Sequence, residues 1–218
     1  MTTSVDSSLD EAPIIVIGGG GHGRVIADII RVSGATFAGF LDDDQAGSIP
    51  DLIGPIDINL PKYVKSHRFV VGIGDGPTRR ALCERILSIN GVLATLIHPA
   101  AVVAVDVRID VGSVVMAGAI INPGTKVGRF VVINTGAIID HDNVLQDNVH
   151  ISPGVAHGGF VVCEEDSFIG VGATLIPRMR VGRGSMVAAG AVVTREVPEY
   201  SLVAGCPAEV KKRLARDS

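Results

Sequence analysis

The residues most suggestive of chemistry are Ile139-Asp140-His141-Asp142. Polar side chains gather there at a place where neighbouring repeats of the chain carry Gly, Pro or Thr. An imidazole can take up a proton near neutral pH, and a carboxylate beside it can fix which ring nitrogen carries the hydrogen. We therefore predict that His141 is a general base and that Asp142 orients it. The competing interpretation is a surface histidine beside a surface aspartate.

Two more histidines, His150 and His157, follow closely. Three clustered histidines could hold zinc, as in solenoidal carbonic anhydrases. The H-x-x-x-x-H pair that such sites resemble is absent, because the spacings are nine and seven residues. We therefore expect no metal. His157 occupies a position that is aliphatic in other repeats, and His157-Gly158-Gly159 is interpreted as a local bulge or loop instead of a buried ligand.

A second candidate site is the glycine run 18–23, Gly-Gly-Gly-Gly-His-Gly, which follows the apolar segment 14–17. It precedes a predicted helix over 24–31 and matches G-x-G-x-x-G. Such a loop lets backbone N–H groups approach a phosphate. Gly21, His22 and Gly23 are the predicted diphosphate contacts. A tight turn that binds nothing is the alternative, but a plain turn has no need for His22.

A predicted strand over 36–41 ends at Asp42-Asp43-Asp44, about twenty residues beyond the glycine loop. A Rossmann-type fold places a carboxylate there, against a ribose or base. We predict that Asp42 contacts the nucleoside, with Asp43 as the second candidate. The alternative is that these residues form a solvated acidic loop that binds nothing. Further strands are predicted over 69–73 and 93–97, with a helix over 77–89. This half-size unit suits a sugar-linked nucleoside diphosphate better than a nicotinamide dinucleotide, which needs two such halves.

The pattern of apolar residues changes at Ile97, where aliphatic side chains begin to recur every six positions. The candidate residues before and after this point must therefore be positioned by two different kinds of structure. Seventeen positions spaced by six run from Ile97 to Val193, and fifteen of them are aliphatic, the exceptions being His157 and Cys163. This period fits neither a helix nor a simple strand and indicates a hexapeptide-repeat β-solenoid. Each repeat contributes a short strand and a turn, three repeats make one triangular coil, and the aliphatic residue points inward. Cys163 is accordingly predicted to be a small buried hydrophobe.

Composition supports this division and excludes other classes. Hydrophobic residues make up 47% and aromatic ones only 4%, which suits a core of Val, Ile and Ala. The net charge of −4 gives no basis for nucleic-acid binding. No apolar run is long enough to span a membrane and no signal peptide is visible. The three scattered cysteines indicate a reduced, cytoplasmic chain, and none lies near His141 in the repeat register, which disfavours a covalent cysteine route.

By these motifs the chain resembles the left-handed β-helix acyltransferases, more narrowly the sialic-acid O-acetyltransferases and bacterial nucleotide-aminosugar N-acetyltransferases. The resemblance covers nearly everything after the first dozen residues. It depends on the motifs at 17–23, 41–43, 97–99, 133–142, 150–154, 169–173 and 203–208. The family often has Glu where this chain has Asp142, which makes the geometry of the pair less predictable.

The resemblance implies an α/β half-Rossmann-like domain followed by a left-handed parallel β-helix. The expected divisions are a disordered lead-in over 1–12, a sugar-nucleotide-binding domain over 13–96, a β-helix acyltransferase domain over 97–197 and a C-terminal cap over 198–218. The cap is expected to include a short helix near 209–214. The implied assembly is a homotrimer with active sites between subunits.

The implied activity is acetyl transfer from acetyl-CoA to the 4-amino group of a nucleotide-linked 4-amino-4,6-dideoxy sugar, for surface polysaccharide or O-antigen synthesis. Gly74 and Asp75 would form the floor of the sugar-nucleotide pocket. The residues implied for acetyl-CoA are His150, Val171, Gly172, Ala173, Ala188 and Ala189. O-acetylation of a sialic-acid-type sugar, a zinc hydratase and a non-catalytic solenoid are the alternatives.

Overall fold

The structure is a computed structural model that describes residues 11–44 and 49–215. The chain divides into two compact units, and the boundary falls between Ala94 and Thr95. Most of the predicted lead-in, residues 1–10, lies outside the described residues. No helix in the described ranges has the length and apolar character needed to cross a bilayer.

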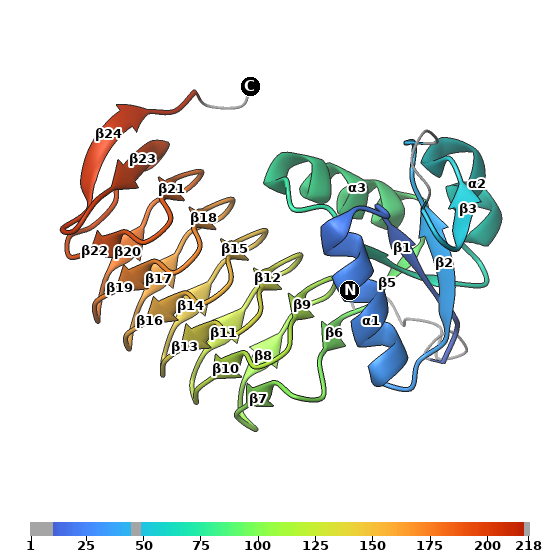
Figure 1. The fold of residues 1–218 in the computed structure, drawn as a ribbon, viewed down its shortest axis with the longest axis horizontal. Helices are drawn as coiled ribbons and strands as arrows, with labels where there is room; N and C mark the ends of the chain where they lie inside the picture. Colours follow the sequence, from blue (N-terminus) through green and yellow to red (C-terminus); the bar gives the residue numbers. More distant parts are fainter. Residues whose placement is uncertain (1–10, 45–48, 216–218) are drawn as a thin grey trace. The chain divides into compact units, whose positions relative to one another are not determined.

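The first unit is a parallel sheet with the strand order β3-β2-β1-β4-β5, flanked by three helices in its described part (Figure 1). Its elements are β1 Ile14–Ile17, α1 Gly21–Val32, β2 Phe37–Leu41, β3 Leu52–Gly54, α2 Ile56–Tyr63, β4 Arg68–Val71, α3 Gly76–Ser88 and β5 Val92–Leu93. Strand β1 is buried along its whole length because both of its neighbours and the helices cover it. The Rossmann-like prediction is thereby confirmed, with β3 and α2 added to it.

Helix α1 begins three residues earlier than predicted, at Gly21. His22 and Gly23 therefore lie in its first turn rather than in the loop before it. The buried face of α1 carries Ile26, Ala27, Ile29 and Ile30, which pack on the sheet at helical spacing. The first turn is thus held rigidly at the carboxyl end of β1.

The second unit is a three-sided parallel β-helix, as the six-residue period predicts (Figure 1). Between β6 and β22, paired strands of the solenoid sheets lie eighteen residues apart, for example Ile139 with His157 and His157 with Leu175. The six-stranded sheet contains β7 Val102–Val103, β10 Ile120–Ile121, β13 Ile138–Ile139, β16 Ala156–His157, β19 Thr174–Leu175 and β22 Val192–Val193. The five-stranded solenoid sheet contains β8 Arg108–Ile109, β11 Lys126–Val127, β14 Val144–Leu145, β17 Val162–Cys163 and β20 Arg180–Val181.

The third, eight-stranded sheet contains β6 Leu96–Ile97, β9 Val114–Val115, β12 Val132–Ile133, β15 His150–Ile151, β18 Phe168–Ile169, β21 Met186–Val187, β23 Ser201–Ala204 and β24 Glu209–Arg213. The expected C-terminal helix was wrong. Residues 209–213 instead form β24, which pairs antiparallel with β23 and continues the sheet beyond the last coil. The pairing satisfies the backbone N–H and C=O groups along the open edge of β23. A helix at the same place would leave those groups unpaired.

The coil interior is built from the predicted inward positions. Ile121, Ile139, Ile151, Cys163 and Ile169 are at most 1% exposed. Ile97, at the first turn of the solenoid, is 42% exposed because no earlier coil covers it. The expected bulge at His157 was also wrong: the histidine lies in β16 in unbroken register and is 3% exposed, pointing inward.

The corners of the prism demand a left-handed residue every six positions. Eight of these are glycines, from Gly112 to Gly190, with φ between 60° and 75°. The remaining positions carry side chains, namely Phe130, Asp142, Asn148, Phe160, Asp166 and Arg178. A large side chain in this conformation is uncommon. The corners are therefore where this chain departs from its own repeat.

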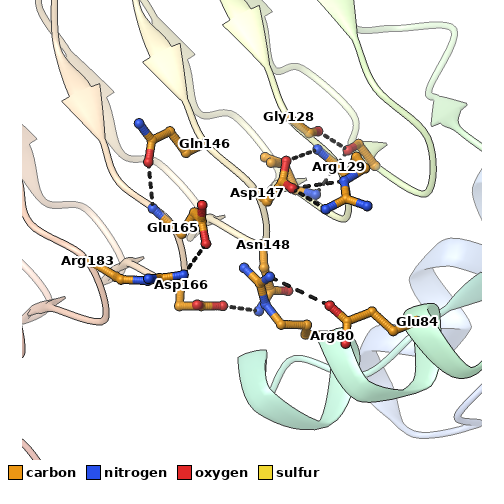
Figure 2. Close-up of polar contacts among 12 residues, drawn as sticks. Arg80, Glu84, Gly128, Arg129, Gln146, Asp147, Asn148, Glu165, Asp166 and Arg183 are labelled. Atoms are coloured by element: carbon orange, nitrogen blue, oxygen red, sulfur yellow. Dashed lines mark hydrogen bonds and ion pairs between the residues drawn. The ribbon is translucent and has the colours of Figure 1, made fainter. Parts of the chain in front are cut away.

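One corner carries a ladder of polar contacts between successive coils (Figure 2). Arg129 binds Asp147 through Nε at 2.8 Å and Nη2 at 2.7 Å, and Arg183 pairs with Glu165. Exposed pairs of this kind contribute about 0.2–1 kcal/mol each. We conclude that the ladder helps to align the coils and leaves the main stabilisation to the aliphatic interior.

Candidate active site

His141 stands at a corner of the solenoid, which we call the His141 corner (residues 122–124, 140–142, 158–160 and 176–178). This corner joins the six-stranded sheet to the five-stranded solenoid sheet. Asp142 takes the left-handed position there, with φ 57°. The side chains of His141 and Asp142 are about half exposed, 49% and 47%. Both predicted catalytic groups are therefore accessible on the outside of the prism.

The two side chains are joined by a hydrogen bond of 2.9 Å between His141 Nδ1 and Asp142 Oδ2. An ionised carboxylate only accepts, so Nδ1 carries the hydrogen and Nε2 keeps its lone pair. The imidazole lies over Gly159, where an added Cβ would come within 2.5 Å of His141 Cε1. The Phe160 ring meets the imidazole edge to face, with ring centroids 5.2 Å apart. The geometry is that of an oriented base with Nε2 available for a proton.

The turn that carries His141 is itself held by Asp140. Asp140 Oδ1 accepts hydrogen bonds from the backbone N–H of His141 at 2.8 Å and from Asn122 Nδ2 at 2.9 Å. These bonds, led by the one from Asn122, lower the pKa of Asp140. An ionised Asp140 thus joins the backbone of this coil to the coil before it.

In the first unit, the glycine run makes a close packing point. Gly18 has φ 96°, and a Cβ on Gly23 would overlap the carbonyl oxygen of Gly18. A Cβ on Gly72 would lie 2.6 Å from the Cα of Gly23. Nothing lies within 4 Å of the Cβ positions of Gly20 and Gly21. The glycines therefore bring α1 against the strand ends and leave its N-terminus open on the loop side.

His22 and Arg79 form the charged environment of this loop. Burial, and after it the positive charge of Arg79, lowers the pKa of His22 to about 4. The Arg79 side chain is only 1% exposed, and its Nη1 donates to the carbonyls of Gly74 at 3.1 Å and Ile73 at 3.4 Å. His22 is therefore neutral at physiological pH beside a buried cation. Sequence reasoning missed Arg79, since nothing in the pattern separates it from Arg80.

The predicted acidic residues of this unit all carry structural hydrogen bonds. Asp42 accepts from the N–H of Gly19 at 2.7 Å, and Asp43 accepts from the N–H of Ile56 at the start of α2 at 2.8 Å. Asp75 caps α3 by accepting from the N–H of Thr78 at 3.0 Å and from its hydroxyl at 2.6 Å, which lowers the pKa of Asp75. A contact with nucleoside or sugar would have to be made in addition to these bonds.

The residues implied for acetyl-CoA lie elsewhere on the solenoid. Val171, Gly172 and Ala189 are exposed at a second corner, the Val171 corner (residues 116–118, 134–136, 152–154, 170–172 and 188–190). Ala188 is half-buried there, and the Ala173 side chain is buried in the coil interior. His150 lies on the outer side of the eight-stranded sheet, stacked on Phe168 with centroids 5.0 Å apart.

The three-fold geometry separates this set from His141. In a triangular prism, the His141 corner lies opposite the eight-stranded sheet, which holds His150. The Val171 corner and the His141 corner bound the two edges of the six-stranded sheet. Within one chain, the structure therefore brings together His141 and Asp142, and it does not bring His150, Val171 or Ala189 to them.

The zinc alternative gains no support from this arrangement. The inward His157 and the outward His150 stand on different sheets, and His141 is at a corner. Within the described ranges, no group of three or more His, Cys, Asp or Glu residues is placed to hold a metal ion.

Comparison with known proteins agrees with both halves of this structure. Residues 13–86 match the family model described as the PglD N-terminal domain. The chain is 31% identical over 212 residues to GDP-perosamine N-acetyltransferase of Escherichia coli O157:H7, an alignment covering 91% of this chain and 96% of that protein. The chain belongs to this family of nucleotide-sugar N-acetyltransferases.

Solved structures of relatives share the whole architecture, including the left-handed β-helix. PerB from Caulobacter crescentus, in complex with CoA and GDP-perosamine, superposes with a TM-score of 0.88 at 38% identity, covering 94% of this chain and 100% of that one. The acetyltransferase domain of PglB from Neisseria gonorrhoeae, in complex with acetyl coenzyme A, has a TM-score of 0.86 at 35% identity, covering 92% and 99%. Family members are acetyl-CoA-dependent enzymes, and the chain is accordingly an acyltransferase.

Proposed function

We propose that the protein transfers the acetyl group of acetyl-CoA to the 4-amino group of a nucleotide-linked 4-amino-4,6-dideoxy sugar, with GDP-perosamine as the acceptor. Its product would serve O-antigen or other surface polysaccharide synthesis. The observation that carries the proposal is the His141–Asp142 pair on an exposed corner, in a chain whose relatives were solved with CoA and GDP-perosamine.

The geometry favours direct transfer without an acyl-enzyme. The neutral sugar amine would attack the thioester carbonyl, forming the C–N bond, and the C–S bond would then break to release CoA. The nitrogen must lose one proton, and Nε2 of His141 is the acceptor because Asp142 holds the hydrogen on Nδ1. A cysteine nucleophile is disfavoured, since Cys83 and Cys163 are buried and the exposed Cys206 lies between β23 and β24, beyond the last coil.

The first unit supports an anionic nucleotide sugar as acceptor. The open N-terminus of α1 presents backbone N–H groups, and the helix dipole favours a negative group there. The buried guanidinium of Arg79 adds positive charge beside His22. We assign the diphosphate to Gly21, His22 and Gly23, the nucleoside to Asp42 and Asp43, and the pocket floor to Gly74 and Asp75.

The separation of His141 from the residues assigned to acetyl-CoA supports a site shared between subunits of a homotrimer. The outer positions of the six-stranded sheet, between the two corners, are mostly apolar: Val102, Ile120, Ile138, Ala156, Thr174 and Val192. Val102 is 63% exposed and Ile138 43% exposed. Contiguous exposed apolar surface of this kind marks protein interfaces. Acetyl-CoA on the Val171 corner of one chain would then meet His141 of its neighbour.

Acceptor identity is tested by a thermal-shift screen of GDP-, UDP- and CMP-linked sugars with and without acetyl-CoA, followed by an assay of CoA thiol release. A bound substrate pair raises apparent stability by mass action. We expect GDP-perosamine to give both the shift and the turnover. Turnover with hydroxyl sugars and none with amino sugars would support O-acetylation instead.

The role of His141 is tested by His141→Asn. We expect kcat to fall by about 10²–10⁴-fold, the usual contribution of a positioned base, while acetyl-CoA binding is retained. Calorimetric titration of acetyl-CoA provides the control for folding. Near-normal turnover at saturating substrates would contradict the assignment.

Sharing of the site is tested by complementation between two inactive variants. His141→Asn lacks the base, and Ala189→Arg places a large side chain on the exposed Val171 corner. We expect each homotrimer to be inactive and co-refolded mixtures to regain activity, because some interfaces combine two intact halves. Inactive mixtures that nevertheless assemble would place the whole site within one chain.

A further inference from the structure

A polar pair lies buried beneath the catalytic corner. Asn143, the residue after Asp142, is completely buried. The two hydrogens on its Nδ2 are shared among the carbonyls of Asp140 at 2.8 Å, of Gly158 at 2.9 Å and of His141 at 3.2 Å. One amide group therefore joins the turn that carries His141 to the coil segment on which the His141 ring lies.

Asn143 is oriented in turn by His157. The three carbonyl contacts require that Nδ2 faces the turn, which leaves Oδ1 directed inward, 3.1 Å from His157 Nδ1. Oδ1 can only accept, so His157 Nδ1 carries the hydrogen. Burial lowers the pKa of His157 to about 3, and the ring is neutral at physiological pH. Its Nε2 has no hydrogen-bond partner among the residues described by the structure.

His157 occupies a position that its neighbours in the sheet fill with aliphatic side chains. Position 157 is an inward position, and its neighbours in the sheet are Ile139 and Leu175. An imidazole with one unsatisfied nitrogen is a costly substitute for leucine in such a core. The hydrogen bond that His157 makes is to Asn143, and Asn143 in turn holds the backbone around His141.

We infer that Asn143 and His157 are positioning residues that hold the catalytic corner, with His157 acting only through Asn143. The inference rests on the proposed function in that His141 is taken as the base. Neither residue touches substrate in this scheme. Their effect is to fix the His141 carbonyl and the Gly158–Gly159 segment relative to each other.

The decisive comparison is between His157→Leu and His157→Gln. Leucine fits the repeat but leaves Asn143 Oδ1 without a donor, whereas glutamine restores an N–H group. Because a misplacement of about 1 Å can cost up to about 10²-fold, we expect kcat of His157→Leu to fall by about tenfold or more. The KM for acetyl-CoA should stay within about twofold, and His157→Gln should regain most of the lost kcat.

Val187→Ala is the matched control, because Val187 is an equally buried inward residue on the sheet opposite the His141 corner. It should lower stability and leave kcat unchanged. Wild-type kcat in His157→Leu, a glutamine variant as slow as the leucine variant, or an equal loss in Val187→Ala would each overturn the inference.

A second readout is independent of catalysis and separates this inference from the proposed function. In ¹⁵N-histidine spectra of the full chain, His157 should show a hydrogen on Nδ1 and a bare Nε2. The His141 ring signals should shift and broaden in His157→Leu and recover in His157→Gln. Absence of acetyl transfer by the wild-type protein would refute the proposed function alone, whereas an Nε2–H tautomer of His157 or unchanged His141 signals would refute the positioning pair.

Discussion

Gly159→Ala is the sharpest perturbation that the structure offers, because the three atoms nearest to the added Cβ all belong to the His141 ring. The backbone of Gly159 is not in the left-handed region, so alanine fits its conformation. The added Cβ would lie 2.5 Å from Cε1, 2.6 Å from Nε2 and 3.1 Å from Nδ1 of His141. The displaced group is the end of a half-exposed side chain, which can move outward without disturbing the core.

The size of the displacement follows from these distances. Ordinary van der Waals contact begins at 3.4 Å, so the ring must move by about 0.9 Å. Such a shift is enough to spoil the alignment of Nε2 with the attacking nitrogen, and it strains the 2.9 Å bond to Asp142. A misplacement of about 1 Å can cost about 10²-fold in rate. We therefore expect kcat to fall by about 10²-fold in a protein that remains folded.

The assay is the steady-state release of CoA with saturating substrates, together with thermal unfolding. Gly128→Ala is the control, since it also adds a Cβ to a corner, there against Asp147 at 2.6 Å, on a different edge of the prism. It should leave kcat unchanged even where it lowers stability. A Gly159→Ala enzyme with wild-type turnover would refute the geometry of the base described above.

Three further predictions concern stability. Gly23→Ala should unfold the first unit, because its Cβ would overlap the backbone carbonyl of Gly18. Gly20→Ala should fold, because nothing lies near its added Cβ. Circular dichroism and sugar-nucleotide binding measure the folded state of the two variants. Asp75→Ala should cost about 0.5–2 kcal/mol at pH 7 in denaturant titrations. Since folding lowers the pKa of Asp75, that difference should disappear as pH falls below about 4. For His157 the unfolded chain takes up a proton below about pH 6.5 and the folded chain only near pH 3, so this residue should contribute about 2 kcal/mol to the loss of stability from pH 7 to 5. His22, whose pKa is lowered to about 4, adds to that loss in both proteins, so the loss should be about 2 kcal/mol smaller in His157→Leu than in the wild type. Equal pH dependence of the two proteins would contradict the buried neutral ring.

The sequence was sufficient for those features that a short period determines. A six-residue repeat with three repeats per coil places Ile139, His157 and Leu175 in one column, and the structure has that register. Because His141 follows the inward Ile139 by two residues, the same repeat predicts that it lies at a corner. In the first unit, β3 and α2 escaped prediction because β3 has only three residues and α2 contains Pro61, so neither shows a clear period. The helix expected near 209–214 was wrong because residues 209–213 take their conformation from the free edge of β23, a long-range partner that no local pattern reveals.

The site was predictable only where its residues break the repeat visibly. His141-Asp142 is a polar interruption of the repeat that is visible in the sequence, and its catalytic role stays a prediction. Arg79 lies in an ordinary amphipathic helix, and its burial depends on the carbonyls of Ile73 and Gly74, which only the folded loop brings to it. Asn143 looks like a further polar corner residue in the sequence. The proposed role of Asn143 depends on its contacts with three carbonyl groups and with the imidazole of His157, fourteen residues away. These contacts form only when the coils stack.

The corners explain how a repetitive scaffold carries a specific site. Each corner needs a left-handed residue, and glycine meets that need without strain. At the His141 corner the column instead runs Gly124, Asp142, Phe160 and Arg178, with φ between 57° and 75°. The Cζ of Arg178 lies 4.8 Å from the centroid of the Phe160 ring, and the Phe160 ring contacts the His141 ring edge to face. Asp142 accepts a hydrogen bond from Nδ1 of His141. Strained positions of this kind cost about 1–3 kcal/mol each and persist where the surroundings enforce them. Three consecutive strained corners converge on one imidazole, and this convergence distinguishes the His141 corner from the all-glycine Val171 corner of the same prism.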